Sequence, residues 1–110
     1  MTIDELELEF ITKVEDEFDN VTCKVISYPV THGHRVKIIM DQDGDELARV
    51  SDADGQLTLY LTITHEVFTH IYNWDRQFEK FWLTLYSKYD VNKNAYYKKH
   101  RTRRIYDQIL

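Results

Sequence analysis

The sequence predicts an α+β fold with an N-terminal helix, a three- to four-stranded antiparallel meander and two to three C-terminal helices. Apolar residues recur every three to four positions up to residue 18, alternate with other residues between 21 and 61, and return to the helical spacing after 64. A chain of 110 residues has about the size of one domain and can bury roughly two-thirds of its unfolded surface. We therefore expect residues 1–110 to form a single domain.

The first helix begins with a capping box. Thr2 and Glu5 have the spacing at which the hydroxyl accepts a backbone N–H and the carboxylate reaches back to the cap. One side of the helix is apolar and consists of Ile3, Leu6, Phe10, Val14 and Phe18. The remaining circumference is mostly acidic, so one face of this helix should pack and the other should be charged.

The meander is predicted from period-two segments separated by turn residues. β-Branched and aromatic residues dominate near 22–28, 34–40, 46–51 and 56–61. Asp43-Gly44 and Asp54-Gly55 lie between such segments, and Asp-Gly supplies the positive backbone dihedrals of tight hairpin turns. Pro29 has no N–H to donate, so it marks a sheet edge or a turn at the end of the first strand.

The C-terminal part has helical spacing again. One apolar seam, from Val67 to Tyr89, predicts a helix over 64–89, with a bend near Asn73, which could cap a second helix. The segment Val91-Asn92-Lys93-Asn94 interrupts the pattern, and a final helix should pass through Tyr97, Ile105 and Ile109.

Three patterns approach metal-binding motifs, and each fails on spacing. His65 and His70 are five residues apart, which separates them by about 140° around a helix. The segment 41–45 has its glycine two residues too early for a calcium loop. His32 and His34 lack further ligands for zinc. We expect no metal, no cofactor and no enzymatic activity.

The expected location is the cytoplasm of a host cell. The N-terminus is acidic where a secretion signal would be basic and apolar, and no apolar segment approaches the ~20 residues that span a bilayer. The single cysteine, Cys23, is typical of a small buried side chain in a reducing compartment. We expect no membrane partner.

Charge is distributed unevenly along the chain. Residues 1–90 carry 18 carboxylates against 8 Lys and Arg, a net charge of −10, whereas residues 91–110 have a net charge of +5. Such asymmetry concerns partners and association rates, and it does not specify the fold.

The acidic residues of the hairpins form the first candidate site. They are Asp41, Asp43, Asp45, Glu46, Asp52 and Asp54. A solvated surface would explain them, and so would a surface that imitates a phosphate backbone and binds the Arg and Lys of a partner.

The basic tail forms the alternative site. It consists of Lys98, Lys99, Arg101, Arg103, Arg104 and Tyr97. These side chains could neutralise phosphates and stack on bases, or they could pair with the acidic N-terminal helix of the same or a second chain.

The order of elements, together with the segment 38–52 (IIMDQDGDELARVSD), resembles small phage-encoded anti-CRISPR inhibitors of Cas9. In such inhibitors an acidic face imitates DNA and blocks the site that reads the PAM. The resemblance implies that the six hairpin carboxylates contact the partner. This chain differs from those inhibitors in two features: it has an extra strand near 57–61, and its tail is basic where theirs tends to be acidic.

We therefore expect a small, non-enzymatic phage or mobile-element protein that binds and inhibits a nucleic-acid-processing protein, Cas9 or another nucleic-acid enzyme. One alternative is a nucleic-acid-binding protein that uses its C-terminal helix. The other is a structural phage protein that self-associates, which leaves a homodimer open.

Overall fold

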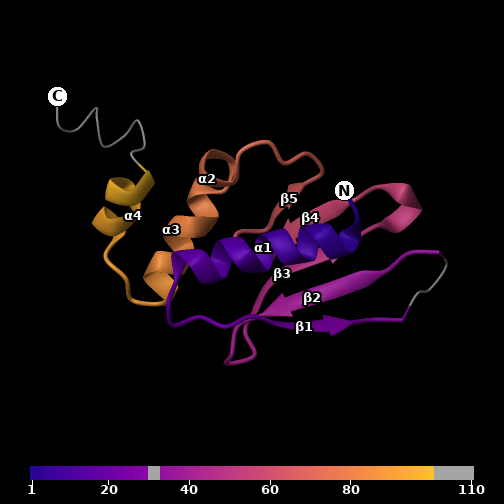
Figure 1. Cartoon of the computed structure of the whole chain (residues 1–110), viewed down its shortest axis with the longest axis horizontal. Helices are drawn as coiled ribbons and strands as arrows, with labels where there is room; N and C mark the ends of the chain where they lie inside the picture. Colours follow the sequence, from indigo (N-terminus) through magenta and orange to yellow (C-terminus); the bar gives the residue numbers. More distant parts are fainter. Residues whose placement is uncertain (30–32, 101–110) are drawn as a thin grey trace. The chain divides into compact units, whose positions relative to one another are not determined.

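The computed structural model describes residues 1–29 and 33–100, and it confirms the α+β class (Figure 1). The chain forms two compact units, Met1–His70 and Ile71–Leu110. Among the described residues, the first contains one long helix and the sheet, and the second contains three helices. Within the described residues, every helix is too short or too polar to cross a lipid bilayer.

Helix α1, Ile3–Glu17, begins where the capping box predicts. The Thr2 hydroxyl accepts the N–H of Glu5, and a Glu5 carboxylate oxygen accepts the N–H of Thr2 at 2.8 Å. This reciprocal pair satisfies two N–H groups that a helix start would otherwise leave unpaired. The apolar stripe of α1 is buried and consists of Ile3, Leu6, Phe10 and Val14.

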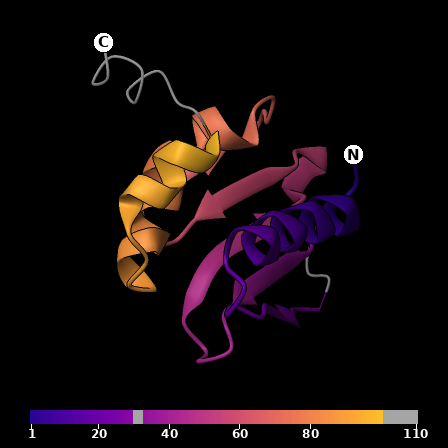
Figure 2. The same ribbon diagram turned by 60° about the vertical axis from the view of Figure 1, so that its left-hand side comes forward.

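The sheet is antiparallel, and its strands are neighbours in the order in which they occur in the chain. It has five strands rather than the predicted three to four: β1 Lys24–Ser27, β2 Val36–Met40, β3 Glu46–Ser51, β4 Thr58–Leu61 and β5 Glu66–Phe68. The first four confirm the predicted meander: β3 has the predicted bounds, and the other three strands are shorter than predicted. Helix α1 packs against β2 and β3, and Figure 2 shows it lying across one face of the sheet.

The strand register separates a buried face from an exposed one. The buried face is fully inaccessible at Ile39, Ala48, Val50, Leu59 and Leu61. The opposite face carries a row of paired residues that crosses all five strands: Ile26, Ile38, Arg49, Tyr60 and Val67. The two ends of that row are exposed, because Ile26 retains 45% and Val67 59% of its accessible surface.

Both Asp-Gly pairs form turns between strands, as predicted. Gly44 connects β2 to β3 with φ +86°, and a short 3₁₀ helix, η1 (Ala53–Gly55), connects β3 to β4. In η1, Asp54 and Gly55 have φ values of 53° and 75°. Positive φ is costly for most side chains, and Asp and Gly tolerate it best.

The helix predicted over 64–89 is wrong for its first nine residues. A turn at Thr62–His65, in which His65 has φ 57°, leads into β5, where Val67 pairs with Tyr60 and Phe68 with Leu59. The β-branched and aromatic residues of 64–69 fit a strand as well as a helical seam, and the pairing with β4 decided between them.

The described part of the second unit contains three helices, which begin after Asn73. Helices α2 (Trp74–Gln77), α3 (Glu79–Lys88) and α4 (Lys93–His100) follow one another. The predicted cap at Asn73 is confirmed, because its side chain accepts the N–H of Asp75 and of Arg76. The predicted continuation through Ile105 and Ile109 lies outside the described residues.

Aromatic contacts hold these helices together. The Trp82 indole donates to the carbonyl of Trp74 at 2.8 Å, and the Tyr96 hydroxyl donates to the carbonyl of Asp75 at 3.1 Å. Tyr96 is fully buried and meets Tyr86 edge-on, with ring centroids 5.5 Å apart. The buried polar ends of these rings thus find partners, as buried Trp and Tyr require.

Candidate protein-binding surface

Asp41 shapes the turn between β2 and β3. It is completely buried, and its Oδ1 accepts the N–H of Asp43 and the N–H of Asp45, each at 3.0 Å. The Asp41 backbone closes the same turn, because its N–H donates to the carbonyl of Asp45 and its carbonyl accepts from Gly44. We therefore assign Asp41 to the turn itself, where it holds Asp43 and Asp45 exposed.

Glu46 is half-buried and paired within the sheet. It forms a bidentate pair with Arg49, with Nε–Oε2 2.8 Å and Nη2–Oε1 3.1 Å, and it also accepts the hydroxyl of Thr62. The Arg49 guanidinium, followed by the Thr62 hydroxyl, lowers the pKa of Glu46 despite some burial. Its charge is largely compensated inside the protein.

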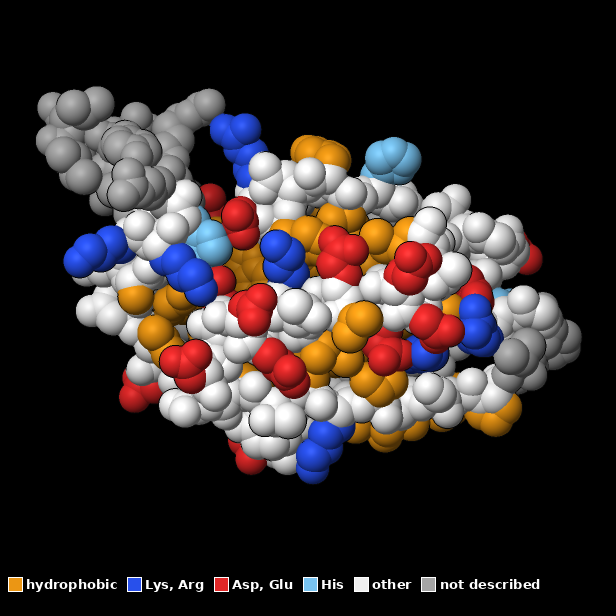
Figure 3. Space-filling view, in the orientation of Figure 1, with side chains coloured by type: hydrophobic (Ala, Val, Ile, Leu, Met, Phe, Trp, Pro, Cys, Tyr) orange, Lys and Arg blue, Asp and Glu red, His pale blue; other side chains and the backbone are white. Residues whose placement is uncertain are grey.

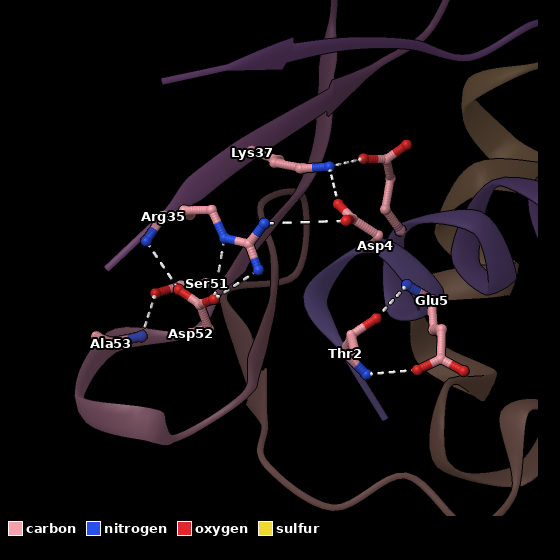
Figure 4. Close-up of polar contacts among 9 residues, drawn as sticks. Thr2, Asp4, Glu5, Arg35, Lys37, Ser51, Asp52 and Ala53 are labelled. Atoms are coloured by element: carbon pink, nitrogen blue, oxygen red, sulfur yellow. Dashed lines mark hydrogen bonds and ion pairs between the residues drawn. The ribbon is translucent and has the colours of Figure 1, made fainter. Parts of the chain in front are cut away.

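Asp52 is held by Arg35 at the other end of β3 (Figure 4). It accepts the Arg35 N–H at 2.8 Å and the guanidinium Nε and Nη2, each at 3.2 Å. The backbone N–H of Arg35 is the main cause that lowers the pKa of Asp52. Figure 4 shows that Asp4 links this pair to Lys37, which also binds Glu7 at 2.7 Å.

The six predicted carboxylates do not form one site. Asp43 and Asp45 lie at one end of β3, whereas Asp52 and Asp54 lie at the other. Six residues of strand separate the two ends by roughly 17–20 Å. Of the six, Asp43, Asp45 and Asp54 are exposed.

The structure brings the β2–β3 turn to the end of α1, through Gln42. The Gln42 amide donates to the carbonyl of Asn20 at 2.9 Å and accepts the N–H of Thr22 at 2.9 Å. These two bonds join segments that are about twenty residues apart in the sequence. Closer in the chain, the N–H of Cys23 donates to Glu15 Oε2 of α1 at 2.8 Å.

The joined segments form a surface that we call the acidic end. It consists of Glu15, Asp16, Glu17, Asp19, Asp43 and Asp45. The last turn of α1 contains no basic residue, although the negative end of the helix dipole favours one there. In the view of Figure 3, carboxylates are spread over the face on which α1 lies.

Sequence reasoning missed the acidic end as a unit. It predicted the acidic face of α1 and the hairpin carboxylates separately, and no spacing in the chain indicates that Gln42 joins them. The burial of Asp41 was equally hidden, because Asp41 and Asp43 look equivalent in the sequence.

The basic tail is described only in part. Lys98 and Lys99 are exposed on α4, whereas Tyr97 is half-buried and meets the Tyr96 ring edge-on at 5.6 Å. His100 Nδ1 lies 3.4 Å from an Asp75 carboxylate oxygen. The remaining predicted members, Arg101, Arg103 and Arg104, lie outside the described residues.

No metal centre is assembled in the part of the chain that the structure describes, because no three His, Cys, Asp or Glu side chains converge there. His65 and His70 flank β5 and do not share a helix. Comparisons with protein-family models, with curated proteins and with solved structures found no match.

Proposed function

We propose that the protein acts by binding, as an inhibitor of the anti-CRISPR type that inserts its acidic end into a basic groove of a nucleic-acid-processing protein. Cas9 or another enzyme that holds DNA is the target class, in the cytoplasm of the host. The observation that carries the proposal is the rigid construction of the acidic end. Asp41 and Gln42 fix a group of like charges that would otherwise separate.

Electrostatics support this proposal. Three consecutive carboxylates, at residues 15–17, lie at the C-terminal end of α1, where a negative charge is unfavourable by about 0.3–1 kcal/mol. Asp43 and Asp45 add further negative charge on the turn that Gln42 ties to this segment. A partner surface rich in Arg and Lys would relieve this repulsion. Relief of the repulsion present in the unbound protein would then contribute to the binding free energy.

Preorganisation supports it as well. A loop that orders on binding loses affinity, at about 0.5–1.5 kcal/mol for each immobilised side chain. Here the turn backbone is already fixed by two bonds to the buried Asp41 carboxylate. The carboxylates can therefore meet a groove built for phosphates with little loss of chain entropy.

The test uses purified full-length protein and a panel of DNA-processing enzymes: Cas9 with its guide RNA, a restriction endonuclease and a DNA glycosylase. Binding is measured by biolayer interferometry, and inhibition by DNA cleavage or base excision. We expect a stoichiometric complex with at least one enzyme, weakened by salt and by competing target DNA. Failure to bind any member of the panel at low salt would overturn the proposal.

A matched pair of variants locates the surface. Asp43→Asn with Asp45→Asn should weaken binding about 10-fold or more, because each removes a charge from the acidic end. The control, Asp54→Asn with Asp90→Asn, removes two charges from exposed positions of positive φ, which Asn tolerates. An equal loss in both variants would show that net charge alone governs binding.

The exposed Lys98 and Lys99 on α4 support a second candidate, a nucleic-acid-binding function. It predicts salt-sensitive binding to short DNA or RNA, with a shallower salt dependence after Lys98→Ala and Lys99→Ala. Absence of binding to duplexes and single strands at low salt would exclude it.

A further inference from the structure

The outer edge of β1 has backbone groups that no described residue pairs. In the antiparallel ladder with β2, Tyr28 N–H donates to the carbonyl of Val36 at 3.0 Å, so Tyr28, Ile26 and Lys24 direct their N–H and C=O groups inward. Val25 and Ser27 direct theirs outward. Figure 1 shows β1 as the last strand of the sheet.

Both ends of this edge are closed to further pairing. The N–H of Cys23, the next outward group before Val25, already donates to Glu15 Oε2 at 2.8 Å. Pro29, the next outward position after Ser27, has no N–H. The open edge therefore contains two residues only, and an added strand can use no other donors.

We propose that β1 pairs antiparallel with β1 of a second copy of this chain, with Ile26 on the two-fold axis. In this register Val25 of one copy faces Ser27 of the other, and the two pairs exchange four backbone hydrogen bonds. The proposal does not rest on the proposed function, because Glu15 is the one carboxylate of the acidic end that enters it, and Glu15 acts here only as the acceptor of the Cys23 N–H.

The other antiparallel symmetric registers fail on donors. Centring the pair on Val25 would place Ser27 opposite Cys23, whose N–H is already occupied. Centring it on Ser27 would place Val25 opposite Pro29, which has no N–H. Only the register centred on Ile26 uses every open donor and leaves none unmatched.

Side chains on the exposed face fit the same register. Ile26 in β1 and Tyr28 directly after it, 45% and 51% exposed, are large hydrophobic groups in contact with water. On pairing, the two Ile26 side chains meet at the axis, in a non-hydrogen-bonded pair whose Cβ atoms lie about 4.5–5.5 Å apart. Lys24 then faces Tyr28 of the second copy, which permits a cation–π contact twice.

This match selects a second copy over an unrelated extended peptide. An unrelated peptide has no defined residues to place opposite Lys24, Ile26 and Tyr28. A second copy of the strand places an aromatic ring, an aliphatic group and a cation opposite them, in complementary order. The interface is small, so association should be weak, with Kd on the order of 100 μM.

Sedimentation velocity of the full-length chain over a wide range of concentrations tests the pairing. We expect the mass to rise from 13.3 kDa toward twice that value as concentration increases. Ile26→Lys should weaken dimerisation at least 10-fold, because it sets two ammonium groups against each other at the axis. The control is Val67→Lys, at the other end of the same cross-strand row, which should dimerise like the wild type.

The register is tested by crosslinking. In a Cys23→Ser background, Ile26→Cys should form a disulfide dimer on mild oxidation, because a non-hydrogen-bonded pair brings the two Cα atoms within disulfide range. Tyr28→Cys should not, because position 28 faces position 24 of the second copy. A wild type that stays monomeric at about 1 mM, ten times the expected Kd, would overturn the proposal. So would equal effects of Ile26→Lys and Val67→Lys, or crosslinking at 28 and not at 26.

Discussion

Replacing Asp41 by alanine should destabilise the protein by about 2–4 kcal/mol. The Asp41 carboxylate accepts two backbone N–H groups at 3.0 Å and has no exposed surface. A hydrogen bond to a charged group contributes about 1.5–3 kcal/mol, which gives roughly 3–6 kcal/mol for two. Asp43 and Asp45 are exposed, so water can recover part of this energy at their N–H groups, which lowers the expected loss.

Two further variants separate charge from geometry. Asp41→Asn keeps a carbonyl oxygen as acceptor and loses the charge. It should therefore lower the free energy of unfolding by about half as much as Asp41→Ala. Asp43→Asn is the same chemical change on an exposed side chain two residues away, and it should change stability by less than about 0.5 kcal/mol.

Urea unfolding provides the assay. It should be followed by far-UV circular dichroism, because both tryptophans, Trp74 and Trp82, lie in the second unit and do not report on the turn. With an m value of about 1–3 kcal/mol/M, the alanine variant should lower the unfolding midpoint by about 1–2 M. If Asp41→Ala costs no more than Asp43→Asn, the assignment of Asp41 as the residue that builds the turn is refuted.

Three other predictions concern the described residues. Asn73→Ala should cost about 1 kcal/mol, because it leaves two N–H groups of α2 without their cap, and Asn73→Ser should restore most of that loss in the same urea assay. Because their partners lower the pKa of Glu46 and Asp52 in the folded state, the unfolded chain binds more protons near pH 4. The stability that these two carboxylates contribute should therefore be complete above about pH 5 and lost below it, as thermal melts across acidic pH would detect. Burial, with a smaller contribution from nearby carboxylates, raises the pKa of Cys23 to about 12, so iodoacetamide should modify it about 10³-fold more slowly at pH 8 than in urea; equal rates would contradict its burial.

The parts of the fold that local chemistry determines could be predicted from the sequence. The capping box at Thr2 and Glu5 and the Asp-Gly turns depend on residues within four positions of one another. The segment 64–72 could not be predicted in this way. Its residues suit both a helix and a strand, and the choice depends on pairing with β4, which the spacing within 64–72 does not encode.

The candidate surface shows the same division. The sequence correctly indicated which residues are acidic, but the burial of Asp41 follows from two backbone N–H groups that turn toward it. Arg49, which compensates Glu46, lies three residues along the same strand, whereas the compensation of Asp52 requires the pairing of β2 with β3 to place Arg35 beside it. Contacts across a sheet are decided by tertiary structure, so composition alone assigned too many carboxylates to one site.

Glu15 connects the acidic end with the β1 edge. It is a residue of the acidic end, and it accepts the N–H of Cys23, so that this N–H cannot pair with an added strand. In the proposed dimer, the two Lys24 positions lie about 14 Å apart along the strands, so the two acidic ends lie toward opposite ends of the paired strands. A dimer could then bind a target that has two basic grooves with an avidity that one copy lacks. Ile26→Lys would reduce the affinity for such a target without altering a single carboxylate. Unchanged affinity in that variant would show that one acidic end suffices.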